Sequence, residues 1–87
     1  MKTNISLKIV DILEKELSYA DFAAKMLNNE IKIFEREYSM SSKSFLKRFE
    51  KGELGDDRKW FGWYGLLLSL NDWDDTKTEI TKTLRAN

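Results

Sequence analysis

Apolar residues recur at intervals of three and four over residues 19–38, and this spacing predicts an amphipathic helix of about five turns. The main apolar row is Ala20, Ala24, Leu27, Ile31, Phe34 and Tyr38. A second, weaker row is Phe22, Met26, Asn29 and Ile33. Ser18 precedes this pattern, with Asp21 three positions later, so we interpret Ser18 as the N-cap of a helix that starts there.

Residues 5–17 fit two different periods. Ile5, Leu7 and Ile9 alternate with other residues, as in a strand. Ile9, Leu13 and Leu17 repeat every four residues, as in a helix. Because Leu, Glu and Lys dominate the segment, we expect a helix, with a short strand over residues 5–10 as the alternative.

A short helix is predicted over residues 42–51. Ser41 or Ser42 supplies an N-cap oxygen, and Gly52 supplies a residue that accepts the left-handed conformation in which helices end. The apolar face of this helix is Phe45, Leu46 and Phe49.

The last predicted helix begins near Asp56 and Asp57, because acidic residues are favourable at a helix N-terminus. Its first part, residues 60–70, is apolar nearly all round, and Trp73, Ile80 and Leu84 then continue one stripe. The pattern allows one helix over 57–85 or a break near residues 71–72.

Together these patterns predict one all-α domain over residues 1–87. The long helix of residues 19–38 is expected to pack antiparallel on the long C-terminal helix, with the 42–51 helix bridging them. The N-terminal segment is expected to pack across this hairpin or to extend it.

The amino-acid composition limits the kinds of functional site that the chain can form. The chain has 15 basic and 15 acidic residues, and no histidine, cysteine or proline. Without histidine or cysteine, the commonest acid–base groups, nucleophiles and transition-metal ligands are missing. No apolar run is long enough to span a membrane, and the N-terminus lacks the features of a signal peptide. We therefore expect a soluble, cytoplasmic protein without a cofactor, a bound metal or a catalytic site.

Two groups of acidic residues are candidate sites. Asp72, Asp75 and Glu79 would share a helix face and suggest a divalent cation, but a solvated helix face is the better interpretation, because a helix cannot wrap carboxylates around an ion as a loop does. The run of Glu53, Asp56, Asp57 and Arg58 is better explained by loop polarity and by the dipole of the following helix than by acid–base catalysis.

A basic edge on the 42–51 helix raises the alternative of a DNA-binding regulator. Its residues are Lys43, Lys47, Arg48 and Lys51. The preceding helix is too long for an ordinary helix-turn-helix unit, and positive charge is in excess in neither half of the chain. Nucleic acid is therefore the less favoured partner.

The aromatic start of the last helix is the strongest functional signal. Side chains at consecutive helical positions point in nearly all directions, and a small domain cannot readily cover all of them. We expect part of this set, most of all Trp60 or Trp63, to contact a partner protein or a second copy of the chain. The predicted contact residues are Trp60, Phe61, Trp63, Tyr64 and Leu67.

Five short runs carry a resemblance to a known class of protein. They are Lys-Glu-Leu-Ser-Tyr at residues 15–19, Phe-Glu-Arg-Glu-Tyr at 34–38, Met-Ser-Ser-Lys-Ser-Phe at 40–45, Phe-Glu-Lys-Gly-Glu-Leu-Gly-Asp-Asp at 49–57 and Trp-Phe-Gly-Trp at 60–63. In this order they resemble small prokaryotic antitoxin-like proteins, which are encoded beside a small toxin. The resemblance implies a non-enzymatic inhibitor that binds and neutralises a toxin.

The sequence thus favours a protein-binding module, antitoxin-like in function. Two alternatives stay open: a DNA-binding regulator that uses the 42–51 helix, and a self-assembling structural dimer.

Overall fold

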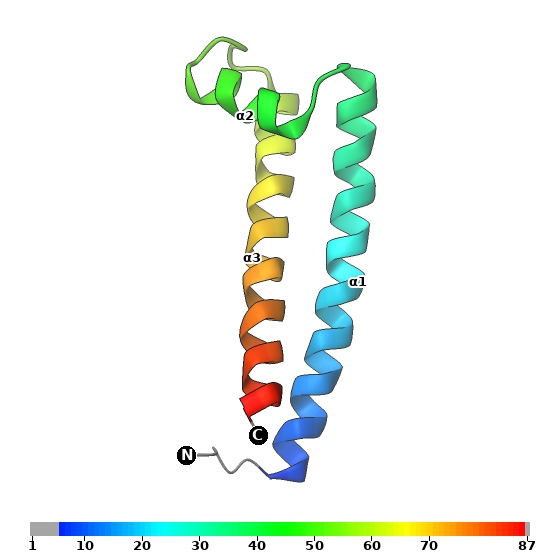
Figure 1. Ribbon diagram of the computed structural model, residues 1–87. Helices are drawn as coiled ribbons and strands as arrows, with labels where there is room; N and C mark the ends of the chain where they lie inside the picture. Colours follow the sequence, from blue (N-terminus) through cyan, green and yellow to red (C-terminus); the bar gives the residue numbers. More distant parts are fainter. Residues whose placement is uncertain (1–5, 87) are drawn as a thin grey trace.

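Three helices form an antiparallel hairpin with a short helix at its closed end (Figure 1). The structure, a computed structural model, describes residues 6–86. Helix α1 spans Leu7–Glu37, α2 spans Ser42–Glu50 and α3 spans Arg58–Ala86. The two long helices run side by side, and α2 folds across the start of α3. The predicted all-α hairpin with a bridging short helix is confirmed.

The start of α1 differs from the expectation. The helix runs without a break through Ser18 and begins after Ser6, whose side chain accepts a hydrogen bond from the Ile9 N–H. Ser18 is therefore not an N-cap. Leu7 and Ile9 are helical, whereas Ile5, the remaining residue of the proposed strand pattern, lies outside the described residues.

The inner faces of the long helices explain this continuity. Along α1 and its C-cap Tyr38, residues 10, 17, 24, 31 and 38 repeat every seven positions, and residues 13, 20, 27 and 34 repeat between them. All nine are apolar or aromatic and are buried or half-buried. In α3, Trp63, Leu70, Lys77 and Leu84 show the same interval, with Leu66, Trp73 and Ile80 between them. Such a period lets two helices stay in contact along their length. Burial of Leu13 and Leu17 against α3 thus favours helix over a cap at Ser18.

Both turns between helices use a residue in the left-handed conformation. After α2, Gly52 has φ 72°, its N–H donates to the Phe49 carbonyl, and the Glu53 N–H donates to the Arg48 carbonyl. These two bonds define a Schellman motif, so the prediction for Gly52 is confirmed. After α1, Ser39 takes the same role with φ 49°, and the Met40 N–H donates to the Glu35 carbonyl.

Helix α3 is continuous, and the alternative break near residues 71–72 does not occur. Its start is fixed by Asp57, whose carboxylate accepts from the Lys59 N–H and whose carbonyl accepts from the Trp60 N–H. Across the described residues, no helix is sufficiently long and apolar to cross a membrane.

The hairpin is elongated and exposes much of its surface. Its extents are 51 × 23 × 18 Å, and its radius of gyration is 17.1 Å. A globular chain of this length is expected to have a radius of gyration of about 12 Å. Two long helices can cover only one face of each other, which leaves the outward faces to solvent.

Candidate protein-binding surface

The aromatic residues at the closed end of the hairpin form a stacked cluster around Trp63. The Trp63 ring lies parallel to Phe45 of α2, with 4.0 Å between ring centroids and 6° between planes. It also stacks on Phe34 of α1 at 5.5 Å. Its indole N–H donates to the Ser42 hydroxyl at 3.1 Å. All three helices therefore meet on this one side chain. We call the rings of this cluster the aromatic head: Phe34, Tyr38, Phe45, Phe49, Trp60, Trp63 and Tyr64.

Trp63 was one of the two preferred partner contacts, and its position corrects that expectation. Its side chain is fully buried within the single chain, as is that of Phe45. A residue enclosed by its own three helices presents no surface to a partner. Trp63 is a core residue, because α2 covers the side of α3 that the hairpin alone would leave open.

Trp60 is half-buried at the edge of the aromatic head. Its ring lies 4.9 Å from that of Tyr38, and the Lys59 ammonium lies 4.9 Å from the Trp60 ring centroid. A cation over an indole face is a favourable contact. Part of the Trp60 ring is thus covered by Tyr38 and Lys59 of the same chain.

The remaining predicted contacts lie on the outer side of α3, beside α2. An open hollow of about 310 Å³ has a mainly apolar lining. We call it the α2–α3 groove, and its lining is Leu46, Tyr64, Leu67, Leu68, Leu70, Asn71 and Asp74. Tyr64 and Leu67 were predicted from the sequence, and the structure brings them together here. Leu46 and Leu68 were missed, although Leu68 lies seven positions after Phe61 on the same helix face.

Phe61 borders this region and is the most exposed aromatic residue of α3. Its side chain is 54% exposed, and that of Leu68 is 51% exposed. Phe49 of α2 supports Phe61 edge-on at 5.4 Å and stacks on Tyr64 at 4.8 Å. The rings of Phe61 and Tyr64 are therefore held by packing, while one side of Phe61 stays open to solvent.

A second apolar surface runs along the outward side of α1. We call it the outer row, and it consists of Ile12, Tyr19, Phe22, Met26 and Ile33. Each of these side chains is exposed to between 48% and 60%. Phe22, Met26 and Ile33 belong to the weaker apolar row predicted from the sequence, which also included Asn29. Of the five residues, Tyr19 also touches α3, because its ring lies edge-on to Trp73 with 5.3 Å between centroids.

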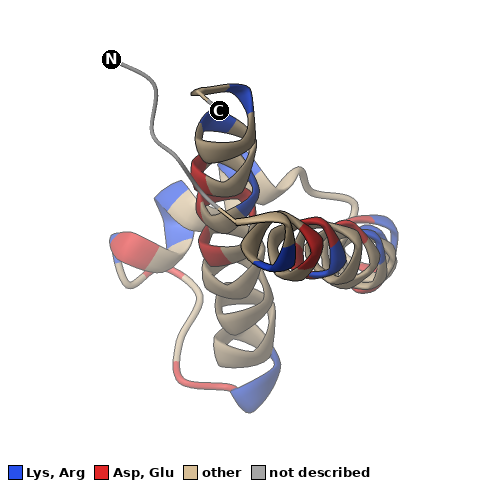
Figure 2. Cartoon of the chain, turned by 90° about the horizontal axis from the view of Figure 1, so that it is seen from below, with Lys and Arg blue, Asp and Glu red and all other residues tan. Residues whose placement is uncertain are grey.

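The basic side chains of α2 are all exposed, but acids lie among them. Lys43, Lys47, Arg48 and Lys51 project from α2 and its C-terminus. The Arg48 guanidinium lies 3.8 Å from the Glu53 carboxylate. Figure 2 shows basic and acidic residues interspersed along α1 and along the C-terminal half of α3. The surface around α2 lacks the concentrated positive charge that is typical of nucleic-acid binding.

The acidic groups weighed as sites have ordinary structural settings. Glu79 lies 3.7 Å from Lys82 on the same helix, and no group of three or more metal-ligating side chains is found within residues 6–86. Asp57 serves as the cap of α3 and lies 3.9 Å from the Lys59 ammonium.

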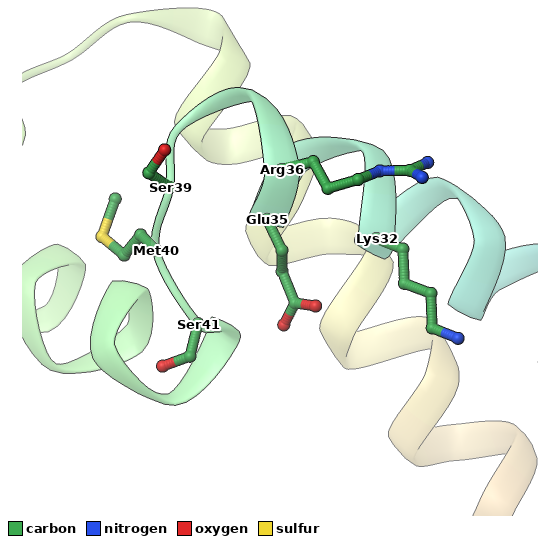
Figure 3. A pocket seen from close by; sticks show the side chains of 6 residues that line it. All are labelled: Lys32, Glu35, Arg36, Ser39, Met40 and Ser41. Atoms are coloured by element: carbon green, nitrogen blue, oxygen red, sulfur yellow. The ribbon is translucent and has the colours of Figure 1, made fainter.

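A polar hollow lies where α1 ends and α2 begins, and it is lined by Lys32, Glu35, Arg36, Ser39, Met40 and Ser41 (Figure 3). The Glu35 carboxylate accepts a hydrogen bond from the Ser42 N–H at 2.9 Å. The Ser41 hydroxyl accepts one from the Ser44 N–H. These polar groups hold the N-terminus of α2 against α1, which orients the Ser42 hydroxyl toward Trp63.

No protein family, curated protein or solved structure matched the chain in comparisons with known proteins. The resemblance to antitoxin-like proteins therefore rests on the short runs of the sequence alone.

Proposed function

We propose that the protein is a non-enzymatic protein-binding module that holds a partner in the α2–α3 groove. The observation that carries this proposal is the exposed apolar surface formed by Leu68, which lines the groove, and Phe61, seven positions earlier on α3, each about half exposed. Large apolar side chains gathered on one exposed surface are typical of protein–protein contact sites.

The shape and chemistry of the groove favour a helical segment as its ligand. The groove is open and runs along α3, and its polar lining residues are Asn71 and Asp74 at one end. An amphipathic helix can lay its apolar side chains into such a groove. A basic residue near the end of that helix would lie close to the Asp74 carboxylate.

The resemblance to antitoxin-like proteins supports a narrower proposal. The partner is then a small toxin encoded by a neighbouring gene, and the groove covers an apolar segment of that toxin. Inhibition needs only binding, and this agrees with a surface built from packed apolar side chains.

The experiment is to express the product of each adjacent gene with and without this protein. Growth arrest by the product alone and rescue by co-expression support the toxin proposal. The affinity of the purified pair is then measured by calorimetry. Leu68→Glu should weaken binding by about thirtyfold or more, because a charge would be buried in the contact.

Met26→Glu is the matched control, because Met26 is 49% exposed against 51% for Leu68 and lies on the outer row of α1. It should leave the affinity for the partner unchanged. Equal loss of affinity in both variants, or no loss in Leu68→Glu, would contradict the assignment of the groove.

A further inference from the structure

We propose that the ligand of the α2–α3 groove is a basic amphipathic helix, whose lysine or arginine side chains meet three aspartates at the C-terminal end of the groove. We call these aspartates the acidic end: Asp72, Asp74 and Asp75. This class of partner rests on the proposed function, because it is assigned to the same groove.

The acidic end continues the exposed apolar stripe of α3. Phe61 and Leu68 lie seven positions apart, which is about 10.5 Å along the helix axis. Asp72 and Asp75 follow Leu68 by four and seven positions, so both lie on the face of the helix that carries Leu68. Asp74 lines the groove itself. A helix that covers Phe61 and Leu68 therefore reaches carboxylates within its next two turns.

The acidic end has no close cation within residues 6–86. Each of the ion pairs found within 4.0 Å among these residues uses a different acid. The Lys77 ammonium lies 2.9 Å from the Asp21 carboxylate, which raises the pKa of Lys77 more than the charge of Asp74 does. One turn after the acidic end, Glu79 lies 3.7 Å from Lys82. Three carboxylates within four residues are therefore available to a basic partner.

The charges at the α2 end of the groove are mixed. On α2, Lys43 precedes the lining residue Leu46 by three positions and Glu50 follows it by four, so a base and an acid flank Leu46. Lys47 lies about 100° further round the helix. The acidic end, by contrast, carries charges of one sign. Complementary charge fixes the orientation of a partner and excludes partners of the wrong sign, so the acidic end is the part that selects.

The same charges disfavour two other ligands of an apolar surface. Nucleic acids carry phosphates, and many membrane surfaces carry anionic lipids, so both would meet the acidic end with like charge. A basic amphipathic helix instead covers Phe61 and Leu68 with apolar side chains and places its cations over the aspartates. The expected ligand has two apolar residues seven positions apart, with lysine or arginine within two turns beyond one of them.

Selection from a phage-displayed library of helical peptides tests this ligand chemistry. Peptides of about 18 residues are long enough to reach from Phe61 to Asp75. The library is panned on the full chain, and peptides that also bind a Leu68→Glu variant are discarded because they bind elsewhere. The retained peptides should share the two apolar residues and an excess of lysine and arginine at one end. Retained peptides without that excess, or with an excess of acids, overturn the proposal.

Binding of one retained peptide, labelled with a fluorophore, measures the contribution of the acidic end. Asp72→Asn, Asp74→Asn and Asp75→Asn combined should weaken binding about tenfold, because each exposed charge contributes modestly. The dissociation constant of the parent should also rise several-fold between about 0.05 M and about 0.5 M salt, and that of the triple variant should rise less. All three positions are exposed on α3, and circular dichroism checks that the helix is kept.

A second triple variant is the matched control for net charge. Glu16→Gln, Glu30→Gln and Glu37→Gln combined remove three exposed acids from α1, far from the groove in sequence and on another helix. This variant should bind the peptide with the affinity of the parent. Equal weakening in the two triple variants would indicate attraction by net charge alone and would overturn the assignment of the acidic end.

Leu68→Glu separates this inference from the proposed function. If Leu68→Glu abolishes peptide binding and the triple aspartate variant keeps full affinity, the groove stays the docking site and the basic class of partner is wrong. If no peptide distinguishes the parent from Leu68→Glu, the proposed function is wrong as well. Sedimentation of the chain alone tests another occupant: a dimer that Leu68→Glu dissociates would place a second copy in the groove and overturn the proposal.

Discussion

The two ends of the hairpin differ in how many elements close them. At the aromatic head, α1, α2 and α3 surround Trp63, whose ring is fully buried and whose N–H has a hydrogen-bond acceptor. At the open end, where α1 begins and α3 ends (Figure 1), α1 and α3 are the two helices of residues 6–86 that face each other. There, Leu13, Leu17 and Leu84 are only half-buried. Two helices cover one stripe of each other, whereas a third element is needed to enclose a large side chain.

This difference predicts that a truncation at the head has the largest effect on stability. Trp63→Ala should lower the free energy of unfolding by about 3–5 kcal/mol, because a large cavity opens and the Ser42 hydroxyl loses its donor. Chemical denaturation followed by circular dichroism measures this change. Phe61→Ala is the control and should cost less than about 1 kcal/mol, since Phe61 is more than half exposed. Equal losses of unfolding free energy in the two variants would show that Trp63 is no more enclosed than Phe61.

A buried residue of the open end should matter less. Ile80 is 6% exposed, but it lies between only two helices. Ile80→Ala should cost about 2 kcal/mol, at the lower end of the range for such truncations, because water and neighbouring side chains can fill the space. Amide hydrogen exchange gives a second measure: amides near Ile80 should exchange faster than those near Trp63. Slower amide exchange near Ile80 than near Trp63 would contradict this expectation.

The same substitution at two glycines should have opposite signs. Gly52→Ala should destabilise the chain by about 1 kcal/mol, because Gly52 has φ 72° at the end of α2. Gly65 lies inside α3, and a Cβ atom there would meet no other atom within 4 Å. Gly65→Ala should therefore stabilise the chain by up to about 1 kcal/mol through helix propensity. Thermal unfolding of both variants against the parent decides the signs, and destabilisation by Gly65→Ala would indicate contacts on that side of α3.

The smallest expected effect concerns the ion pair that spans the long helices. The Asp21 carboxylate lies 2.9 Å from the Lys77 ammonium and, through a hydrogen bond and its charge, raises the pKa of Lys77 above the ordinary lysine value. A raised pKa in the folded state means that the pair stabilises folding below the ordinary lysine pKa. This contribution is lost as the pH rises through the folded-state pKa.

Asp21→Asn tests this sign. The difference in unfolding midpoint between parent and variant should be small and constant from about pH 6 to about pH 9.5, and should shrink at higher pH. Denaturant unfolding across this range measures it, with Lys15→Gln as a control for an exposed pair within one helix. A difference that grows above the ordinary lysine pKa would contradict the assignment.

Local chemistry in the sequence determined several features before any packing was known. The sequence placed the start signal of the short helix at Ser41 or Ser42 and its end signal at Gly52, because a hydroxyl acceptor and a residue free to adopt positive φ act within one turn. In the structure Ser41 is the N-cap and Gly52 has positive φ. The apolar rows at intervals of three and four likewise predicted two long helices. These properties depend on neighbours along the chain, which the sequence lists directly.

Only the tertiary structure decided which apolar side chains are core and which are surface. Residues 60–70 are apolar nearly all round the helix, so their periodicity selects no single face. The position of α2 buried Trp63 and left Phe61 exposed. In the same way, Ser18 has the chemistry of a cap, but α1 runs through it as one helix in which Leu13 and Leu17 are half-buried on the inner row. Burial depends on residues that are distant in sequence, and that information arises only when the helices pack.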